Sequence, residues 1–172
     1  MKKLFSLLFV CVLLTSSAMA ETVTWEEVGE PAVAAYELQG DFVALNDMGL
    51  TLWIPSDMSY MEPSEEDAAA GRYAIFMDND QECVLTIDAV YVEGITLDQA
   101  YENAVANGMT EPEIVNINGI DALTYADETD NSGCVVLVDT NSNIILFSFA
   151  PVDSDVGKIG YAVIMSSLMP LE

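Results

Sequence analysis

Apolar residues at helical spacing, with capping residues at the start, mark four segments of the chain. In the clearest segment, Thr96 and Gln99 have the spacing of a capping box, a stripe of apolar side chains follows, and a glycine ends the pattern. In the first segment, Thr24 and Glu27 have the same spacing, and Pro31 either kinks the helix or opens a second one. The predicted helical segments are 24–40, 64–71, 96–107 and 155–168.

Strand patterns and turn residues fill the intervals between these helices. Asn118-Gly119 is the favoured two-residue hairpin turn. The runs 134–138 and 144–149 are almost wholly apolar, which predicts central strands covered on both faces. Residues 56–71 are predicted to be a connector. Because hairpins dominate, we expect an α+β fold with helices packed on a largely antiparallel sheet. The predicted strands are 41–45, 49–54, 72–77, 83–92, 113–117, 120–125, 134–138 and 144–149.

Four short motifs in this order of elements are familiar from a known group of proteins. They are Gly-Leu-Thr-Leu-Trp-Ile-Pro (49–55), Gly-Ile-Thr-Leu-Asp-Gln-Ala (94–100), Val-Asn-Ile-Asn-Gly-Ile-Asp-Ala-Leu-Thr-Tyr (115–125) and Ser-Ser-Leu (166–168). Together they resemble the PsbP-like α/β/α sandwich group, which includes the photosystem II extrinsic subunit P, a nuclear Ran-binding import factor and many small secreted bacterial proteins. The resemblance covers roughly residues 40–170. It implies a sandwich fold and partner binding rather than catalysis, and it supplies no catalytic residues.

The first twenty residues have the pattern of a bacterial-type secretory signal. Lys2 and Lys3 precede an apolar run at 4–14, and Ala18-Met19-Ala20 is a small-x-small cleavage site. The apolar run is too short to span a bilayer. Cys11 follows Phe9-Val10, where a lipoprotein signal has small residues, which argues against a lipid anchor. We therefore expect a secreted or periplasmic protein whose mature chain, 21–172, is a single α+β domain.

The predicted mature chain is strongly acidic. It carries 29 aspartates and glutamates against two basic residues, Arg72 and Lys158, which gives a formal charge of −27. Such a surface repels nucleic acids and anionic lipid, so no nucleic-acid partner is predicted. No stretch after the signal reaches 18 apolar residues, so no membrane span is predicted either. The favoured charged partners are cations and basic proteins.

The absence of histidine removes several kinds of chemistry. Ser-His-Asp and Cys-His catalysis are impossible, and zinc or copper sites lack their usual ligands. A pair of carboxylates in an aromatic cleft would serve a glycoside hydrolase, and Trp25, Trp53, Tyr60 and Tyr73 are the aromatic residues available for one. Nothing in the sequence places a particular carboxylate among them, so a hydrolase ranks third among the hypotheses.

Acidic turns make calcium the most physical of the metal hypotheses. The segments 78–82 and 139–143 have oxygen ligands at the opening spacing of a calcium loop, but the sixth position is Cys83 or Ile144 instead of glycine. Asp and Asn are also the ordinary residues of tight turns, where they cap the backbone. Solvated turns are therefore the alternative to a calcium site. The predicted calcium ligands are Asp78, Asp80, Glu82, Asp127 and Asp130.

Two further groups of side chains leave alternatives open. Cys83 and Cys134 either form one disulfide, as an exported protein permits, or remain two buried thiols. An aromatic and methionine cluster at the start of the connector is either core or an exposed patch for a protein or cell-envelope partner. The sequence thus predicts an exported, non-enzymatic binding or accessory protein, with a calcium-dependent module as the alternative. The residues of the predicted patch are Trp53, Met58, Tyr60 and Met61.

Overall fold

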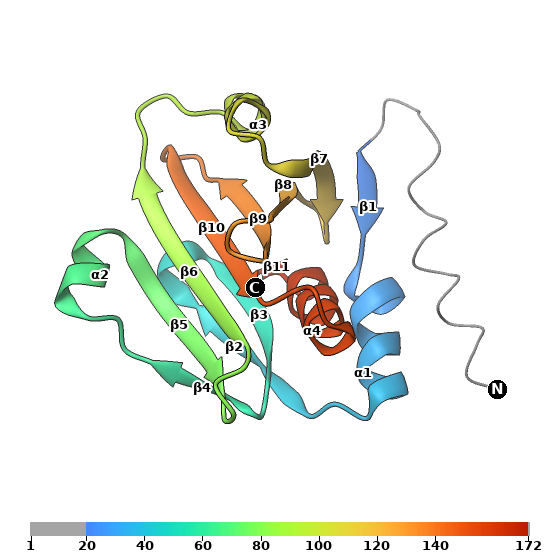
Figure 1. Cartoon of the computed structure of the whole chain (residues 1–172). Coiled ribbons are helices and arrows are strands. Elements are labelled where there is room, and N and C mark those ends of the chain that lie inside the picture. Colours follow the sequence, from blue (N-terminus) through green and yellow to red (C-terminus); the bar gives the residue numbers. More distant parts are fainter. Residues whose placement is uncertain (1–19, 172) are drawn as a thin grey trace.

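The computed structural model describes residues 20–171, so nearly all of the predicted signal lies outside the described residues. Two sheets and four α-helices make up this part of the chain (Figure 1). The helices are α1 (Glu30–Tyr36), α2 (Glu65–Ala69), α3 (Leu97–Ala106) and α4 (Asp155–Ser166). The strands are β1 (Glu21–Val23), β2 (Gly40–Leu45), β3 (Leu50–Pro55), β4 (Met58–Met61), β5 (Arg72–Asp78), β6 (Val84–Tyr91), β7 (Thr110–Ile117), β8 (Ile120–Asp127), β9 (Ser132–Val138), β10 (Asn143–Ala150) and β11 (Met169–Pro170).

The large sheet has eight strands in the order β1-β7-β8-β9-β10-β6-β5-β4. All of its pairs are antiparallel except β1 with β7. The small sheet has the order β11-β3-β2 and is antiparallel. The predicted α+β class and the central position of β9 and β10 are confirmed. Strands β1, β4 and β11 were not predicted, because each has at most four residues and too few positions to show a pattern.

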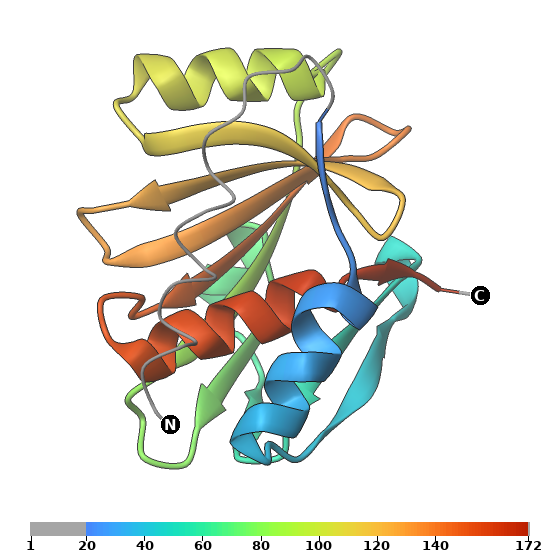
Figure 2. The same cartoon turned by 90° about the vertical axis from the view of Figure 1, so that its right-hand side faces the viewer.

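The elements form three layers around the large sheet. Figure 2 shows α3 on one side of the strands, with α4 and α1 on the other. We call the side of α4 the inner face and the side of α3 the outer face. A Cβ atom at Gly133 would lie 2.6 Å from the ring of Tyr161, so glycine on β9 lets α4 pack closely on the inner face.

The core lies between the inner face, α4 and the small sheet. Its largest fully buried side chains come from both sheets and from the end of α4: Phe147, Leu52, Leu85, Ile87, Ile164 and Leu168. On the strands of the large sheet, these core residues alternate with outer-face positions, as the pleat of a sheet requires. Packing therefore fixes which side chains of β6, β9 and β10 remain on the outer face.

The N-terminal helical segment is two consecutive pieces. A π-helical turn at Trp25–Gly29 begins at Thr24, whose hydroxyl accepts the N–H of Glu27 at 3.3 Å. Helix α1 follows at once with Pro31 in its first turn, so of the two alternatives the one in which this proline opens a second helix holds. No helix in residues 20–171 is long and apolar enough to cross a membrane.

Candidate functional site

Helix α3 covers only part of the outer face. It begins at Thr96, where both hydrogen bonds of the predicted capping box are present, Gln99 N to Thr96 Oγ1 at 3.2 Å and Thr96 N to Gln99 Oε1 at 3.0 Å. The buried side chains beneath it are small on the helix, Ala100 and Ala104, and branched on the sheet, Leu123 and Val136. Because α3 packs against β7, β8 and β9, the outward side chains of β10 lie beside the helix and remain half-buried.

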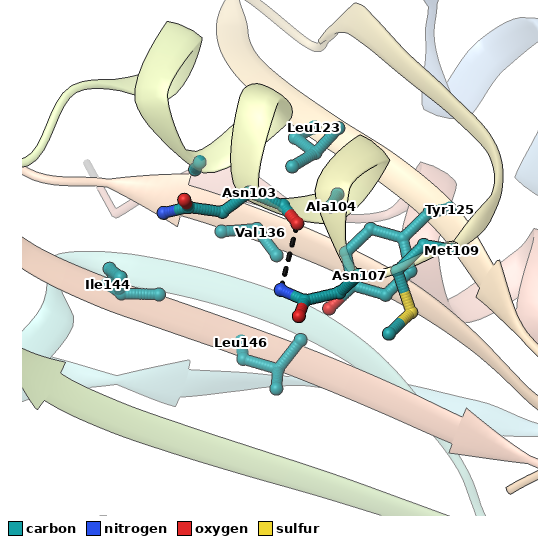
Figure 3. Close-up of a pocket in the computed structure, with 10 residues that line it drawn as sticks. Asn103, Ala104, Asn107, Met109, Leu123, Tyr125, Val136, Ile144 and Leu146 are labelled. Carbon is teal, nitrogen blue, oxygen red and sulfur yellow. Dashed lines mark hydrogen bonds between the residues drawn. The ribbon is translucent and has the colours of Figure 1, made fainter. Parts of the chain in front are cut away.

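A groove runs between α3 and β10, and we call it the α3 groove (Figure 3). Its volume is about 180 Å³. Ile144 and Leu146 of β10 lie across the groove from Asn103 and Asn107 of the helix (Figure 3). The side-chain amide of Asn107 donates to the carbonyl oxygen of Asn103 at 2.8 Å. The complete lining is Ala100, Asn103, Ala104, Asn107, Met109, Leu123, Tyr125, Val136, Ile144 and Leu146.

The α3 groove is electrically neutral. None of its lining residues carries a charged side chain, and burial raises the pKa of the Tyr125 phenol, so the phenol keeps its proton at neutral pH. The neighbouring Cys134 thiol lies 3.6 Å from Ser132 Oγ and 3.7 Å from Ser148 Oγ, and burial raises its pKa as well. This chemistry favours binding of apolar groups rather than transfer of a proton.

The outer face continues beyond the groove across β6 and β5. Register places Val90 opposite Ile144, and Asp88 opposite Leu146. Val90 is 43% exposed, and Asp88 forms an ion pair with Arg72 of β5. On β6 and β5 the outer face therefore combines a half-exposed apolar side chain with an ion pair.

The predicted aromatic and methionine patch is divided by the structure. Trp53 is only 5% exposed, because Trp25 packs on it with ring centroids 5.9 Å apart. The main-chain N–H of Trp53 also donates to Ser167 Oγ at 2.8 Å. Met58 is half-buried against the core, whereas Tyr60 and Met61 are 58% and 46% exposed. For Trp53 the alternative of core packing therefore holds, whereas Tyr60 and Met61 are exposed on β4.

The predicted calcium ligands lie in turns where carboxylates accept main-chain N–H groups. Asp78 Oδ1 accepts from Glu82 N at 2.7 Å and from Cys83 N at 3.0 Å, and Asp127 Oδ1 accepts from Thr129 N at 2.9 Å. Within residues 20–171 no three acidic or cysteine side chains are grouped so that they could hold a metal ion. Calcium binding, with Asp80 and Asp130 as further ligands, stays a prediction. A calcium-selective rise in melting temperature that Asp78→Asn abolishes would support it.

Cys83 and Cys134 are both free thiols. Cys83 packs against the core beside β6, whereas Cys134 on β9 contacts the serines of the outer face. Strand β10 separates β9 from β6, so the two cysteines are at least two strand spacings apart, which is roughly 9.6 Å. That distance exceeds the range of about 4.4–6.8 Å between the Cα atoms of a disulfide. The alternative of two thiols holds.

Sequence reasoning missed the α3 groove, although one signal for it was present. The apolar run 144–149 predicts a strand covered on both faces, and the structure confirms this on the inner face only. On the outer face, α3 leaves Ile144 and Leu146 half-buried. How much of a sheet a helix covers depends on where the helix packs, and the sequence pattern of the strand does not contain that information.

Comparisons with known proteins show the fold. No protein-family model and no curated protein matches the sequence. The cyanobacterial PsbP (CyanoP) of Synechocystis sp. PCC 6803 matches in structure with a TM-score of 0.51 at 14% identity, over 77% of this chain and 93% of that chain. A crystal structure from Bacteroides thetaiotaomicron VPI-5482 matches with a TM-score of 0.52 at 16% identity, over 78% of this chain and 50% of that chain.

A third solved structure is more distant. The Ran-binding protein Mog1p of Saccharomyces cerevisiae has a TM-score of 0.44 at 11% identity, over 78% of this chain and 97% of that chain. The resemblance seen in the sequence motifs is therefore matched in three dimensions by CyanoP, across most of both chains. This chain has the PsbP-like α/β/α sandwich fold.

Proposed function

We propose that this protein is an exported, non-enzymatic accessory protein that binds a partner protein through the α3 groove and the adjoining outer face. The observation that carries the proposal is the exposure of apolar side chains at the centre of the large sheet. Ile144 and Leu146 belong to a central strand, yet α3 stops short of covering them. An apolar surface rimmed by polar residues is typical of an interaction site.

The lining of the groove supports binding of apolar side chains. Each large apolar side chain that a partner buries there contributes roughly 1.5–3 kcal/mol. Asn103 and Asn107 line the helical side, and their amides can hydrogen-bond to the main chain of a bound segment. The absence of charge in the lining means that an apolar segment enters without stripping water from an ion.

The charge of the molecule supports a basic partner. Residues 20–171 contain only Arg72 and Lys158 as cations, and Arg72 is paired with Asp88. A positively charged partner is therefore attracted to almost every side of the molecule, which raises its rate of association. The fold shared with CyanoP is compatible with this role, and the sequence resemblance to the PsbP-like group implies partner binding.

Site-specific photo-crosslinking tests where a partner binds. A photoreactive residue replaces Leu146 in the groove, and a matched control replaces Val156, which is 73% exposed on α4 on the opposite side of the sheet. We expect a discrete crosslinked partner from position 146 and none from position 156. Equal crosslinking from both positions would mean that the protein binds through charge alone.

The affinity of the isolated partner completes the test. Leu146→Glu places a charge in the groove at a half-buried position beside α3, so we expect at least tenfold weaker binding and only a small fall in melting temperature. Val156→Glu is the matched control and should bind as the wild type does. Unchanged affinity of Leu146→Glu would refute the groove as the site. Export is tested separately, by N-terminal sequencing of the mature protein, which we expect to begin at Glu21.

A further inference from the structure

Strand β4 forms one edge of the large sheet and carries main-chain groups without a partner. The N–H of Asn79 donates to the carbonyl of Asp57 at 3.0 Å, which fixes the alternation of hydrogen-bonded pairs between β4 and β5. By that alternation, Ser59 and Met61 direct their N–H and C=O groups toward β5. Met58 and Tyr60 direct theirs away from the sheet, and no group within residues 20–171 bonds to them.

The side chains of β4 do not prevent another strand from pairing with this edge. Natural edge strands are usually blunted by lysine, proline, a bulge or an inward-pointing charge, and the sequence of β4, Met-Ser-Tyr-Met, has none of these. Tyr60 is anchored by Phe76, with the two rings edge to face at 5.7 Å, although 58% of the residue is exposed. Figure 1 shows β4 at the margin of the molecule.

The edge of the small sheet provides a contrast. Strand β2 also pairs on one side only, but it contains a charged residue, Asp41, and begins with a glycine, Gly40. Charge and glycine both discourage the addition of another strand. Strand β1, at the far edge of the large sheet, has only three residues, and β11, at the other edge of the small sheet, has two, one of them a proline. Among the strand edges of residues 20–171, β4 is thus the one suited to accept a further strand.

Acidic side chains flank β4 at both ends. Asp57 and Asp78 lie at its start, and Glu82 follows in the β5–β6 turn, where its main-chain N–H donates to Asp78 Oδ1 at 2.7 Å. Burial and then the charges of Asp78, Glu82 and Asp57 raise the pKa of the Cys83 thiol. Three acidic residues of α2 and Glu62 follow the other end of the strand.

We propose that β4 accepts an extended, positively charged segment of the partner protein as an additional strand, bonded to the main chain of Met58 and Tyr60. A second copy of this chain does not suit the edge, because its carboxylates would face those that flank β4. Basic residues of an extended segment would meet them at either end, while the main-chain bonds supply the affinity.

This inference rests on the proposed function, because it names the chemistry of the partner and a second place where that partner is held. Strands β6 and β5 separate β4 from β10, so the edge is three strand spacings from the α3 groove, roughly 14 Å. One partner can therefore reach both.

Amide NMR of the mature protein with a synthetic peptide tests the edge directly. The probe is a ten-residue peptide of alternating lysine and valine with blocked ends, and the control peptide alternates glutamate and valine. At low salt we expect the lysine peptide to shift the Met58 and Tyr60 amides and to slow their hydrogen exchange at least tenfold. The glutamate peptide should change neither.

Two variants at one position separate the main chain from the side chain. Tyr60→Pro removes the outward N–H and leaves the bonds of Ser59 and Met61 to β5 intact, whereas Tyr60→Val removes only the aromatic side chain. We expect the proline variant to bind the lysine peptide at least tenfold more weakly than the valine variant, with both variants folded. Equal binding by the two would overturn the proposal.

The remaining outcomes distinguish this inference from the proposed function. Shifts at Ile144 and Leu146 without shifts at Met58 and Tyr60 would support the groove and overturn the edge. Shifts at the edge would support the edge even if crosslinking from position 146 failed. Dimerisation of the free protein that Tyr60→Pro abolishes would identify a second copy as the occupant and overturn the basic partner.

Discussion

The two faces of the large sheet are built from the same strands but differ in how they are covered. On β10, Ile145 and Phe147 point to the inner face and are 4% and 0% exposed, because α4 and the small sheet seal them. Ile144 and Leu146 point to the outer face and remain half-buried beside α3. Adjacent residues of one apolar run are thus alternately buried on the inner face and partly exposed on the outer face.

This difference shows that a strand can carry apolar residues for more than one reason. The inner face needs apolar residues because they make the core that holds two sheets and α4 together. The outer face holds α3 with small alanines and leaves the rest of its apolar surface partly in contact with water. Stability accounts for the first face, and the proposed binding of a partner is our explanation for the remaining surface of the second.

The largest expected effect comes from a matched pair of truncations on β10. Ile145→Ala removes a buried side chain from the core and should lower the free energy of unfolding by about 3 kcal/mol. Ile144→Ala removes the same atoms from a half-buried position, so we expect about 1 kcal/mol. Urea unfolding of both variants measures the difference.

Equal losses of unfolding free energy in these two variants would contradict the difference between the two faces. They would mean that the outer face is as fully packed as the inner face, and that the α3 groove is filled in solution. Unfolding of Ile144→Ala in the presence of a bound partner sharpens the test, because a ligand of the native state adds stability in proportion to its affinity. We expect that gain to be smaller for Ile144→Ala than for Ile145→Ala.

A smaller effect is expected at Asn118, whose side chain links the β7–β8 turn to Trp25 and to the C-terminal end of α4. Its Oδ1 accepts the N–H of Trp25 at 2.9 Å, and its Nδ2 donates to the carbonyls of Ser166 at 2.7 Å and Leu168 at 2.9 Å. Asn118→Gly retains the positive φ of 47° that the hairpin turn requires and removes only these bonds. We expect a loss of about 2 kcal/mol in urea unfolding.

The neighbouring Asn116 provides the control for this measurement. Its side chain bonds to Asp121 and to the N–H of Gly119 within the same exposed turn and reaches no other element. Asn116→Ala should therefore cost clearly less than Asn118→Gly. A similar loss in both variants would show that the turn itself, rather than the contacts of Asn118 to α4 and Trp25, carries the stability.

Asn118 also shows how far the sequence could predict this structure. The dipeptide Asn118-Gly119 predicts a two-residue hairpin turn, and β7 and β8 confirm it. The bonds from Asn118 to α4 could not be predicted, because Ser166 and Leu168 are 48 and 50 residues away and local patterns carry no information about such contacts. Capping boxes and hairpins were predictable because the forces that form them act within a few residues.

The candidate sites likewise divide into features that local sequence predicts and features that depend on distant contacts. Tyr60 and Met61 were named from composition alone, and the structure shows both exposed on an edge strand. Trp53 was grouped with them although its burial depends on Trp25 and on Ser167, which is 114 residues away. The α3 groove was not predicted, because it arises where a helix ends its contact with a sheet, and the apolar run 144–149 does not say where that is.

The smallest expected effect concerns the turn that joins β9 to β10 and so aligns both faces. Asp139 Oδ1 accepts the N–H groups of Asn141 and Asn143 at 2.8 Å each, and its Oδ2 accepts from Asn143 Nδ2 at 2.7 Å. Burial raises the pKa of the Asp139 carboxyl, but the hydrogen bonds from Asn143 and Asn141 outweigh it, so the pKa lies below its ordinary value.

A lowered pKa in the folded state has a definite consequence for stability. The ionised carboxylate stabilises the fold fully above the ordinary aspartate pKa of about 3.9, and this contribution is lost as the pH falls through the lower folded-state value. We expect Asp139→Ala to cost about 1 kcal/mol at pH 7 and less below pH 4, in urea unfolding at each pH. Asp80→Ala, at an exposed carboxylate of the β5–β6 turn, should change little at either pH. A cost of Asp139→Ala that is independent of pH would show that its charge does not hold the turn, and that the register of β9 and β10 depends on packing alone.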